Sequence, residues 1–266
     1  MAWALFKANI RNNRTIWVLM TLVLCMYFAI MISMFDPVSA QGLEQMLEML
    51  PEAMARAFGF SNIGTTLTTF LASYLYGFLV LLFPMVISIV VNHGLVASHV
   101  DKGSMAYLLA TPNSRRKIAT TQAVSSLASI TAFFVLITVF VIAISQSMFP
   151  GELEIGKFVL INVYALLMYF AIGGIGFFAS CIAEEGKQSL RFGIGLPVGF
   201  LLLKLLGDAG ERFSWIGNLS LYKLFDPIKL VEGASFAYIG MILFALIAVA
   251  LYTGGIAIFN KRDMHV

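Results

Sequence analysis

The sequence predicts an all-α integral membrane protein, with six transmembrane helices, an N-terminal amphipathic interfacial helix and a short cytoplasmic helix. First, 60% of its 266 residues are apolar and only 12% are charged, whereas a soluble domain carries about 25% charged residues. Second, several runs without Asp, Glu, Lys or Arg reach the length of about 20 residues that a helix needs to cross about 30 Å of hydrocarbon. Third, Lys and Arg gather in alternate loops, which is the pattern of a chain that crosses a membrane repeatedly.

The uncharged runs give the boundaries of the expected spans, within one transmembrane domain that covers residues 1–266. The fifth span is the weakest, because Lys204 interrupts it near one end, four residues before Asp208. Lys204 either reaches the membrane surface by snorkelling or is a buried functional charge, and the sequence leaves both readings open. Pro84 and Pro197 fall inside the second and fifth spans and are expected to kink them. The six spans are expected at about 15–35, 68–91, 122–147, 158–182, 192–207 and 238–259.

The distribution of Lys and Arg predicts that both termini lie in the cytoplasm, because loops on that side of a membrane carry the excess of basic residues. Most acidic residues fall in the segments 36–67 and 208–237, which are therefore expected to be external. We expect a multi-pass protein of the cell membrane. The basic residues expected on the cytoplasmic side are Lys7, Arg11, Arg14, Lys102, Arg115, Arg116, Lys117, Lys187, Arg191, Lys261 and Arg262.

Two amphipathic stretches are too polar to span a membrane. In residues 1–14, Trp3, Phe6 and Ile10 recur at helical spacing and basic residues take the other faces. This pattern predicts a helix on the cytoplasmic membrane surface, although it also fits a basic extension of the first span. The second stretch, 43–58, is expected to be an external helix that packs on the bundle or gates its outer mouth.

The cytoplasmic loop 98–118 carries the most informative pattern. Ser104 can cap a short helix that runs to about Ala110, and Pro112 ends it, because the residue before a proline resists helical geometry. An exposed helix with an apolar face must be covered either by its own bundle or by a groove on a partner protein. The apolar face and the basic residues after it comprise Met105, Tyr107, Leu108, Leu109, Arg115, Arg116 and Lys117.

Residues that carry soluble-type catalysis are missing from the sequence. A G-x4-G-K match at Gly151–Lys157 is discounted, because Phe158 replaces the Ser or Thr that would hold magnesium. The spans contain no Asp or Glu, which argues against a carrier coupled to protons or sodium through a buried carboxylate. Cys25 and Cys181 lie in apolar runs and are expected to be reduced. We therefore expect no catalytic residue, no metal site and, at a net charge of +3, no nucleic-acid partner.

The loop resembles the signature loop of ABC-2-type transporter permeases, in which acids lead to Gly-Ser, a Leu-Leu pair, a small residue with Pro, and Ser-Arg. This chain departs from the pattern in having a single acid nearby. The basic start of the chain resembles the connecting helix of that family, and the segments around Leu50-Pro51 and Phe259–Asp263 are similar to its members. The matching loop residues are Asp101, Gly103, Ser104, Leu108, Leu109, Thr111, Pro112, Ser114 and Arg115.

The resemblance implies the six-helix permease of an ATP-binding-cassette exporter, which pairs with a second permease chain, identical or not, and docks on a separate cytoplasmic ATPase. ATP and magnesium would then bind to the partner ATPase, and no cofactor would bind to this chain. A hydrophobic or amphipathic cargo, such as a drug, a lipid or a peptide, would fit a path lined by Phe, Met, Ser and Thr residues of the second and fifth spans. A second, smaller contact with the ATPase is expected at Glu184, Glu185 and Lys187. The implied coupling residues are Asp101, Gly103, Ser104, Met105, Tyr107, Leu108, Leu109, Pro112, Arg115 and Arg116.

Three other classes of membrane protein compete with this reading. A secondary carrier or channel would work without an ATPase and would depend on an ion gradient. A membrane scaffold or an integral membrane enzyme would also fit a bundle of apolar helices. A neighbouring gene that encodes a nucleotide-binding protein would favour the transporter over all three.

Overall fold

The structure, a computed structural model, describes residues 1–35, 66–101, 107–108, 110–183 and 186–261. Within these ranges, six helices are long and apolar enough to cross a membrane and no strand occurs. The predicted all-α membrane fold is therefore confirmed. The helix expected at 43–58 lies outside the described residues.

The elements follow one another along the chain as spans joined by short connections. The spanning elements are α1 (Trp3–Met34), the continuous unit of α4 (Leu67–Tyr74), η1 (Leu75–Leu79) and α5 (Val80–Leu95), then α8 (Arg115–Met148), α9 (Ile155–Ile182), α10 (Gly186–Ala209) and α13 (Ser235–Lys261). The short elements are α6 (Ala97–Asp101) after α5, and η2 (Glu211–Phe213), α11 (Ser214–Gly217), η3 (Leu221–Leu224) and α12 (Pro227–Val231) between α10 and α13.

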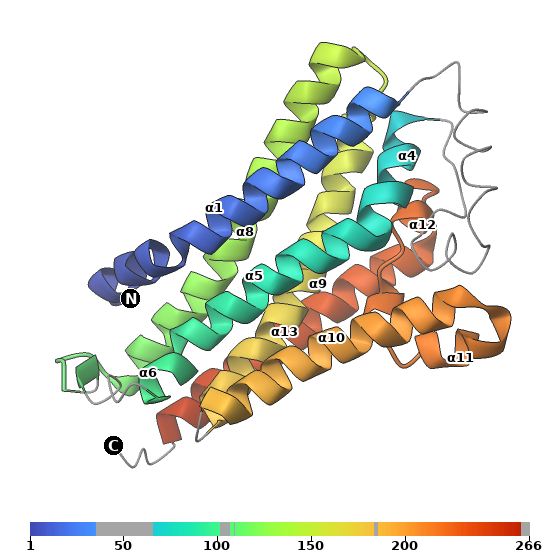
Figure 1. The fold of residues 1–266 in the computed structure, drawn as a ribbon. Coiled ribbons are helices and arrows are strands. Elements are labelled where there is room, and N and C mark those ends of the chain that lie inside the picture. Colours follow the sequence, from blue (N-terminus) through green and yellow to red (C-terminus); the bar gives the residue numbers. More distant parts are fainter. Residues whose placement is uncertain (36–65, 102–106, 109, 184–185, 262–266) are drawn as a thin grey trace.

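The helix α9 lies at the centre of the bundle, where α5, α8, α10 and α13 pack around it, and α1 and α10 lie on opposite sides (Figure 1). Its central place is reflected in the aromatic side chains that it buries, among them Phe158, Tyr164 and Tyr169. A Cβ atom added at Gly173 would lie 3.1 Å from the hydroxyl of Tyr252 on α13. Small residues on α9 therefore allow the close helix contacts that hold membrane bundles together.

The two ends of the bundle differ in charge. We call one of them the basic end; it holds the N-terminus, α6, residues 110–114 and the last turn of α13 (Figure 1). Residues 110–114 lead directly into Arg115, Arg116 and Lys117 at the start of α8. The opposite end holds α11 and α12.

The first helix is longer than the expected first span. α1 is one continuous helix of 32 residues, so the structure does not separate residues 1–14 from the first span. The first half of α1 packs along α8: the N–H of Ala2 donates to Thr121 Oγ1 at 2.8 Å, and Trp17 Nε1 donates to the carbonyl of Ser129 at 3.0 Å. A helix on the membrane surface and a basic extension of the first span both place this stretch in a helix that leads into the span.

The second span contains both a π-helical turn and a proline. In the π-turn η1, the N–H of Val80 donates to the carbonyl of Leu75. Pro84 lies inside α5, and because proline has no N–H, the carbonyl of Val80 loses its helical donor. The hydroxyl of Tyr169 on α9 donates to this carbonyl at 2.9 Å. The neighbouring helix thus satisfies the group that the proline leaves open.

At the opposite end, an ion pair fixes the position of Lys204. Its Nζ lies 2.7 Å from one carboxylate oxygen of Asp208, and Lys223 Nζ lies 3.2 Å from the other. The side chain of Lys204 is only 11% exposed. Lys204 is therefore a mostly buried charge with a structural partner, and the pairing with Lys223 ties η3 to α10.

The same end contains a close approach of two backbones. The end of α10 and α11 meet at Gly207 and Gly217, where a Cβ atom added at Gly207 would overlap the Cα atom of Gly217 and lie 2.6 Å from its nitrogen. Only residues without a side chain allow two chain segments to come this close. Two glycines are thus what allows the chain to fold back against α10.

Candidate coupling site

Those of the expected coupling residues that the structure describes lie at the basic end, from the last residue of α6 to the first turn of α8. The structure describes Asp101 as the last residue of α6, a helical turn at Tyr107 and Leu108, and the chain from Ala110 onward. The remaining expected members, Gly103, Ser104, Met105 and Leu109, lie outside the described residues.

Tyr107 and Leu108 have opposite environments. Tyr107 is 79% exposed, whereas Leu108 is half-buried and packs against the hydrophobic core of the bundle. The hydroxyl of Thr111 donates to the carbonyl of Leu108 at 2.6 Å and so closes the turn before Pro112. The loop is therefore anchored to its own bundle by one side chain and presents the neighbouring aromatic ring outward.

The basic residues after the loop occupy the first turn of α8. Ser114 caps this helix, because its Oγ accepts a hydrogen bond from the N–H of Lys117 at 3.2 Å. Arg115 is half-buried, and Arg116 and Lys117 are exposed. Cations at a helix N-terminus oppose the helix dipole, so this placement is unfavourable for the isolated helix. A phosphate or carboxylate outside the chain would offset that cost.

The N-terminus lies beside the loop. A cavity of about 370 Å³ is lined on one side by the first residues of α1, including Trp3 and Leu5, and on the other by Leu108, Thr111 and Asn113. The side chain of Trp3 is 69% exposed and its ring stacks on Phe6, with 5.5 Å between ring centroids. The expected connecting segment and the expected coupling loop therefore share one surface at the basic end.

A buried side chain, Gln122 of α8, links the helices on both sides of the loop. Its Nε2 donates to the carbonyl of Leu95 at the end of α5, and its Oε1 accepts from Nδ2 of Asn9 on α1. Asn9 Nδ2 also donates to Ser125 Oγ at 3.0 Å. Gln122 is 1% exposed and Asn9 is 7% exposed. We call Asn9, Gln122 and the Leu95 carbonyl the amide clamp.

Sequence reasoning missed the amide clamp. The sequence offered one indication, namely that Gln122 places an amide at the start of the third span and Asn9 places another in the amphipathic stretch 1–14. Nothing in the sequence pairs Asn9 with Gln122, which is 113 residues away. The clamp joins the helix α5, which leads through α6 into the loop, to the helix α8, which leads out of it.

The structure describes one of the three residues at which a second, smaller contact with the partner is expected. Lys187 is exposed at the start of α10, and Glu184 and Glu185 lie outside the described residues. Nearby, the hydroxyls of Ser180 and Ser189 lie 2.9 Å apart and join the end of α9 to α10. In the described ranges, no group of His, Cys, Asp and Glu side chains could hold a metal ion.

A comparison with known proteins adds information on the whole chain. A family model described as "ABC-2 family transporter protein" matches residues 1–264. No curated protein and no solved structure matches the chain.

Proposed function

The chain belongs to the ABC-2 transporter family, and from this premise we propose that it is the permease subunit of an exporter driven by a separate cytoplasmic ATPase. The supporting observation is the exposed ring of Tyr107 beside the anchored side chain of Leu108. An aromatic ring that protrudes from a fixed turn suits insertion into a cleft of a partner protein. ATP and Mg²⁺ would bind to that partner.

The proposed mechanism is the transfer of a rigid displacement. ATP binding would close two ATPase subunits, and each would move the loop lodged in it. Leu108 and the Ser114 cap join the loop to the bundle. The amide clamp joins α1, α5 and α8, so the loop, the N-terminus and three spans would shift together.

The remaining parts of the proposal concern the second chain and the cargo. We propose that two permease chains pair and enclose the transport path, and that the cargo is a hydrophobic or amphipathic drug, lipid or peptide. The apolar character of the described spans supports this class of cargo, and Lys204, which lies within α10, is already paired with Asp208.

We propose that the basic end faces the cytoplasm at the cell membrane. On a background with Cys25→Ala and Cys181→Ala, a Ser114→Cys variant should react with a membrane-impermeant maleimide only after the cytoplasmic side is opened. Ser147→Cys, at the other end of the same helix, should react in intact cells. Both serines are exposed. The reverse labelling pattern would invert the topology.

Docking on the ATPase can be tested at Tyr107. We expect Tyr107→Ala to weaken co-purification with the ATPase by roughly 30-fold in Kd, because loss of an aromatic hot-spot side chain costs about 2 kcal/mol. The fold should survive, since the ring is exposed. Adding Leu108→Asp should abolish both co-purification and stimulated ATP turnover.

The matched control for docking is Tyr238→Ala, which removes an exposed tyrosine near the start of α13. This variant should retain both the ATPase and its turnover. If the Tyr107→Ala, Leu108→Asp double variant behaves like the control, the coupling assignment is wrong. Transport that persists without any ATPase and follows an ion gradient would favour a secondary carrier.

A further inference from the structure

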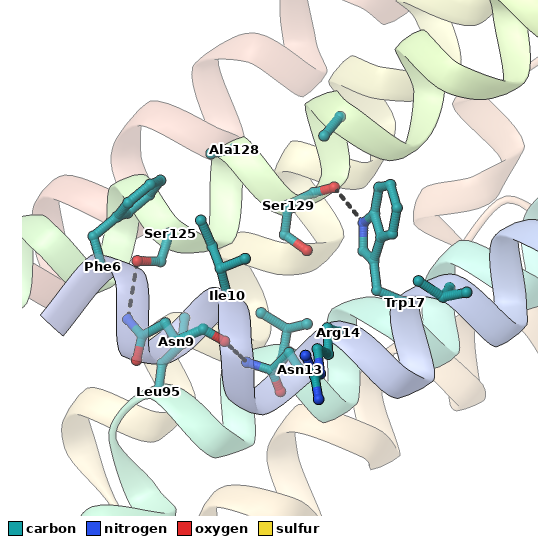
Figure 2. A pocket seen from close by; sticks show the side chains of 13 residues that line it. Phe6, Asn9, Ile10, Asn13, Arg14, Trp17, Leu95, Ser125, Ala128 and Ser129 are labelled. Carbon is teal, nitrogen blue, oxygen red and sulfur yellow. Dashed lines mark hydrogen bonds between the residues drawn. The ribbon is translucent and has the colours of Figure 1, made fainter. Parts of the chain in front are cut away.

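The groove between α1, α5 and α8 has the chemistry of a lipid site. It encloses about 470 Å³, within the range of about 300–1,000 Å³ that is typical of ligand pockets. Phe6, Ile10 and Trp17 extend from α1 toward α8, whose Ala128 and Ser129 lie on the other side (Figure 2). The groove is distinct from the cavity beside the coupling loop.

The walls of the groove are apolar in effect. Three polar lining side chains bond within the chain: Asn9 to Ser125 at 3.0 Å, Asn13 Nδ2 to the carbonyl of Asn9 at 3.1 Å, and Trp17 Nε1 to the carbonyl of Ser129 at 3.0 Å. A cavity lined by apolar groups holds hydrocarbon more readily than water. The interior of the groove therefore suits an acyl chain.

The rim of the groove carries a cation at the membrane boundary. Arg14 lines the groove, is exposed, and is the last charged residue before the uncharged stretch 15–35. Arg11 and Lys7 precede Arg14 on the same helix and are also exposed. Residues 1–35 contain no Asp or Glu that could neutralise these three cations. Basic residues at this depth attract anionic lipid headgroups.

We propose that this groove binds one anionic phospholipid from the leaflet at the basic end, with its phosphate at Arg14 and an acyl chain between α1 and α8. Lipid surrounds the protein at this depth in the membrane. The apolar wall of the groove matches an acyl chain, and its cationic rim matches an anionic headgroup. The site goes beyond the proposed transport function and does not depend on ATPase docking.

The experiment uses the fluorescence of Trp17 in the full chain, reconstituted in nanodiscs. Trp3→Phe and Trp215→Phe leave Trp17 as the single tryptophan. Quenching by dibrominated phosphatidylglycerol is compared with quenching by dibrominated phosphatidylcholine at equal bromine content. We expect an association preference of about fivefold for the anionic lipid, the factor that one cation near the membrane surface supplies.

Four variants separate a specific lipid site from ordinary lipid contact. Arg14→Gln should remove the preference, whereas Lys187→Gln, an exposed cation on α10, should keep it. Ala128→Phe should fill the groove and reduce quenching by both lipids. In a Trp17→Phe, Leu22→Trp variant the probe sits on an exposed face of the same helix, and its quenching should show no preference. Equal quenching of Trp17 by both lipids, or a preference that survives Arg14→Gln, would overturn the proposal.

Discussion

Replacing Gln122 by leucine is expected to lower the free energy of unfolding by about 2–4 kcal/mol, because each buried polar group left without a partner costs about 1–3 kcal/mol. The change removes the donor to the Leu95 carbonyl and the acceptor for Asn9 Nδ2. Asn9 keeps its bond to Ser125, which limits the loss on that side. Unfolding in mixed detergent micelles with increasing dodecyl sulfate would measure the effect.

Two further variants test whether the amide clamp acts as a unit. Gln146→Leu makes the same change near the other end of α8, at a half-buried position, and should cost well under 1 kcal/mol, as is usual away from buried networks. The Asn9→Leu, Gln122→Leu double variant should cost clearly less than the sum of its two single changes, since groups that share one network couple by about 0.5–3 kcal/mol. Additive losses would show that the two amides act independently.

The clamp should also decide whether α1 moves with the coupling loop. With spin labels at Lys7 on α1 and Thr120 on α8, both exposed, the distance should be unchanged between nucleotide-free and ATP-trapped complexes of the native chain. In Gln122→Leu, ATPase docking should persist through Tyr107, but the label distance should change on trapping. An unchanged distance between the labels in the variant would mean that contacts other than the amide clamp keep α1 moving together with α8.

Gly207→Ala is expected to destabilise the fold by about 3 kcal/mol or more, at or above the top of the usual range for overpacking. The added Cβ would overlap the backbone of Gly217 and lie 2.6 Å from its nitrogen, and backbone atoms cannot move aside as a side chain can. The chain from η2 to η3 would have to separate from α10 and break the Lys223–Asp208 pair. Thermal unfolding in detergent would report the loss as a lower midpoint.

The control for this prediction lies two turns earlier in the same helix. A Cβ atom added at Gly199 would meet no atom within 4 Å. Gly199→Ala should therefore leave stability unchanged or raise it by up to about 1 kcal/mol, because alanine is the better helix former. If Gly207→Ala is equally harmless, the two backbones do not pack as closely as described.

The sequence predicts the six spanning helices because the length of a run without charged residues can be read from the local sequence. It underestimates the helices themselves: the third span is expected at 122–147, and α8 runs over Arg115–Met148. A helix continues past the hydrocarbon wherever neighbouring helices support it. The same reason explains why residues 3–14 are continuous with the helix of the first span, since Ala2 and Asn9 find partners on α8.

The candidate site is only partly predictable for a related reason. A local motif identifies the loop and its exposed Tyr107, because the pattern of small, apolar and proline residues lies within about twenty positions. The amide clamp and the Gly207–Gly217 contact depend on which surfaces meet after folding. No rule of sequence spacing predicts that Asn9 contacts Gln122. The sequence also does not distinguish a glycine that packs against a neighbouring segment from one that does not.

The π-turn at Leu75–Leu79 has a consequence for how the two halves of the second span are oriented relative to each other. Such a turn holds one residue more than the regular helix on either side, and one residue corresponds to about 100° of rotation. The half-span before it contacts α12, α1 and α9, and the half-span after it contacts α1, α8, α9 and α10. A single inserted residue thus sets the angle by which the side chains beside α12 are rotated about the helix axis relative to those of the half-span that leads to α6.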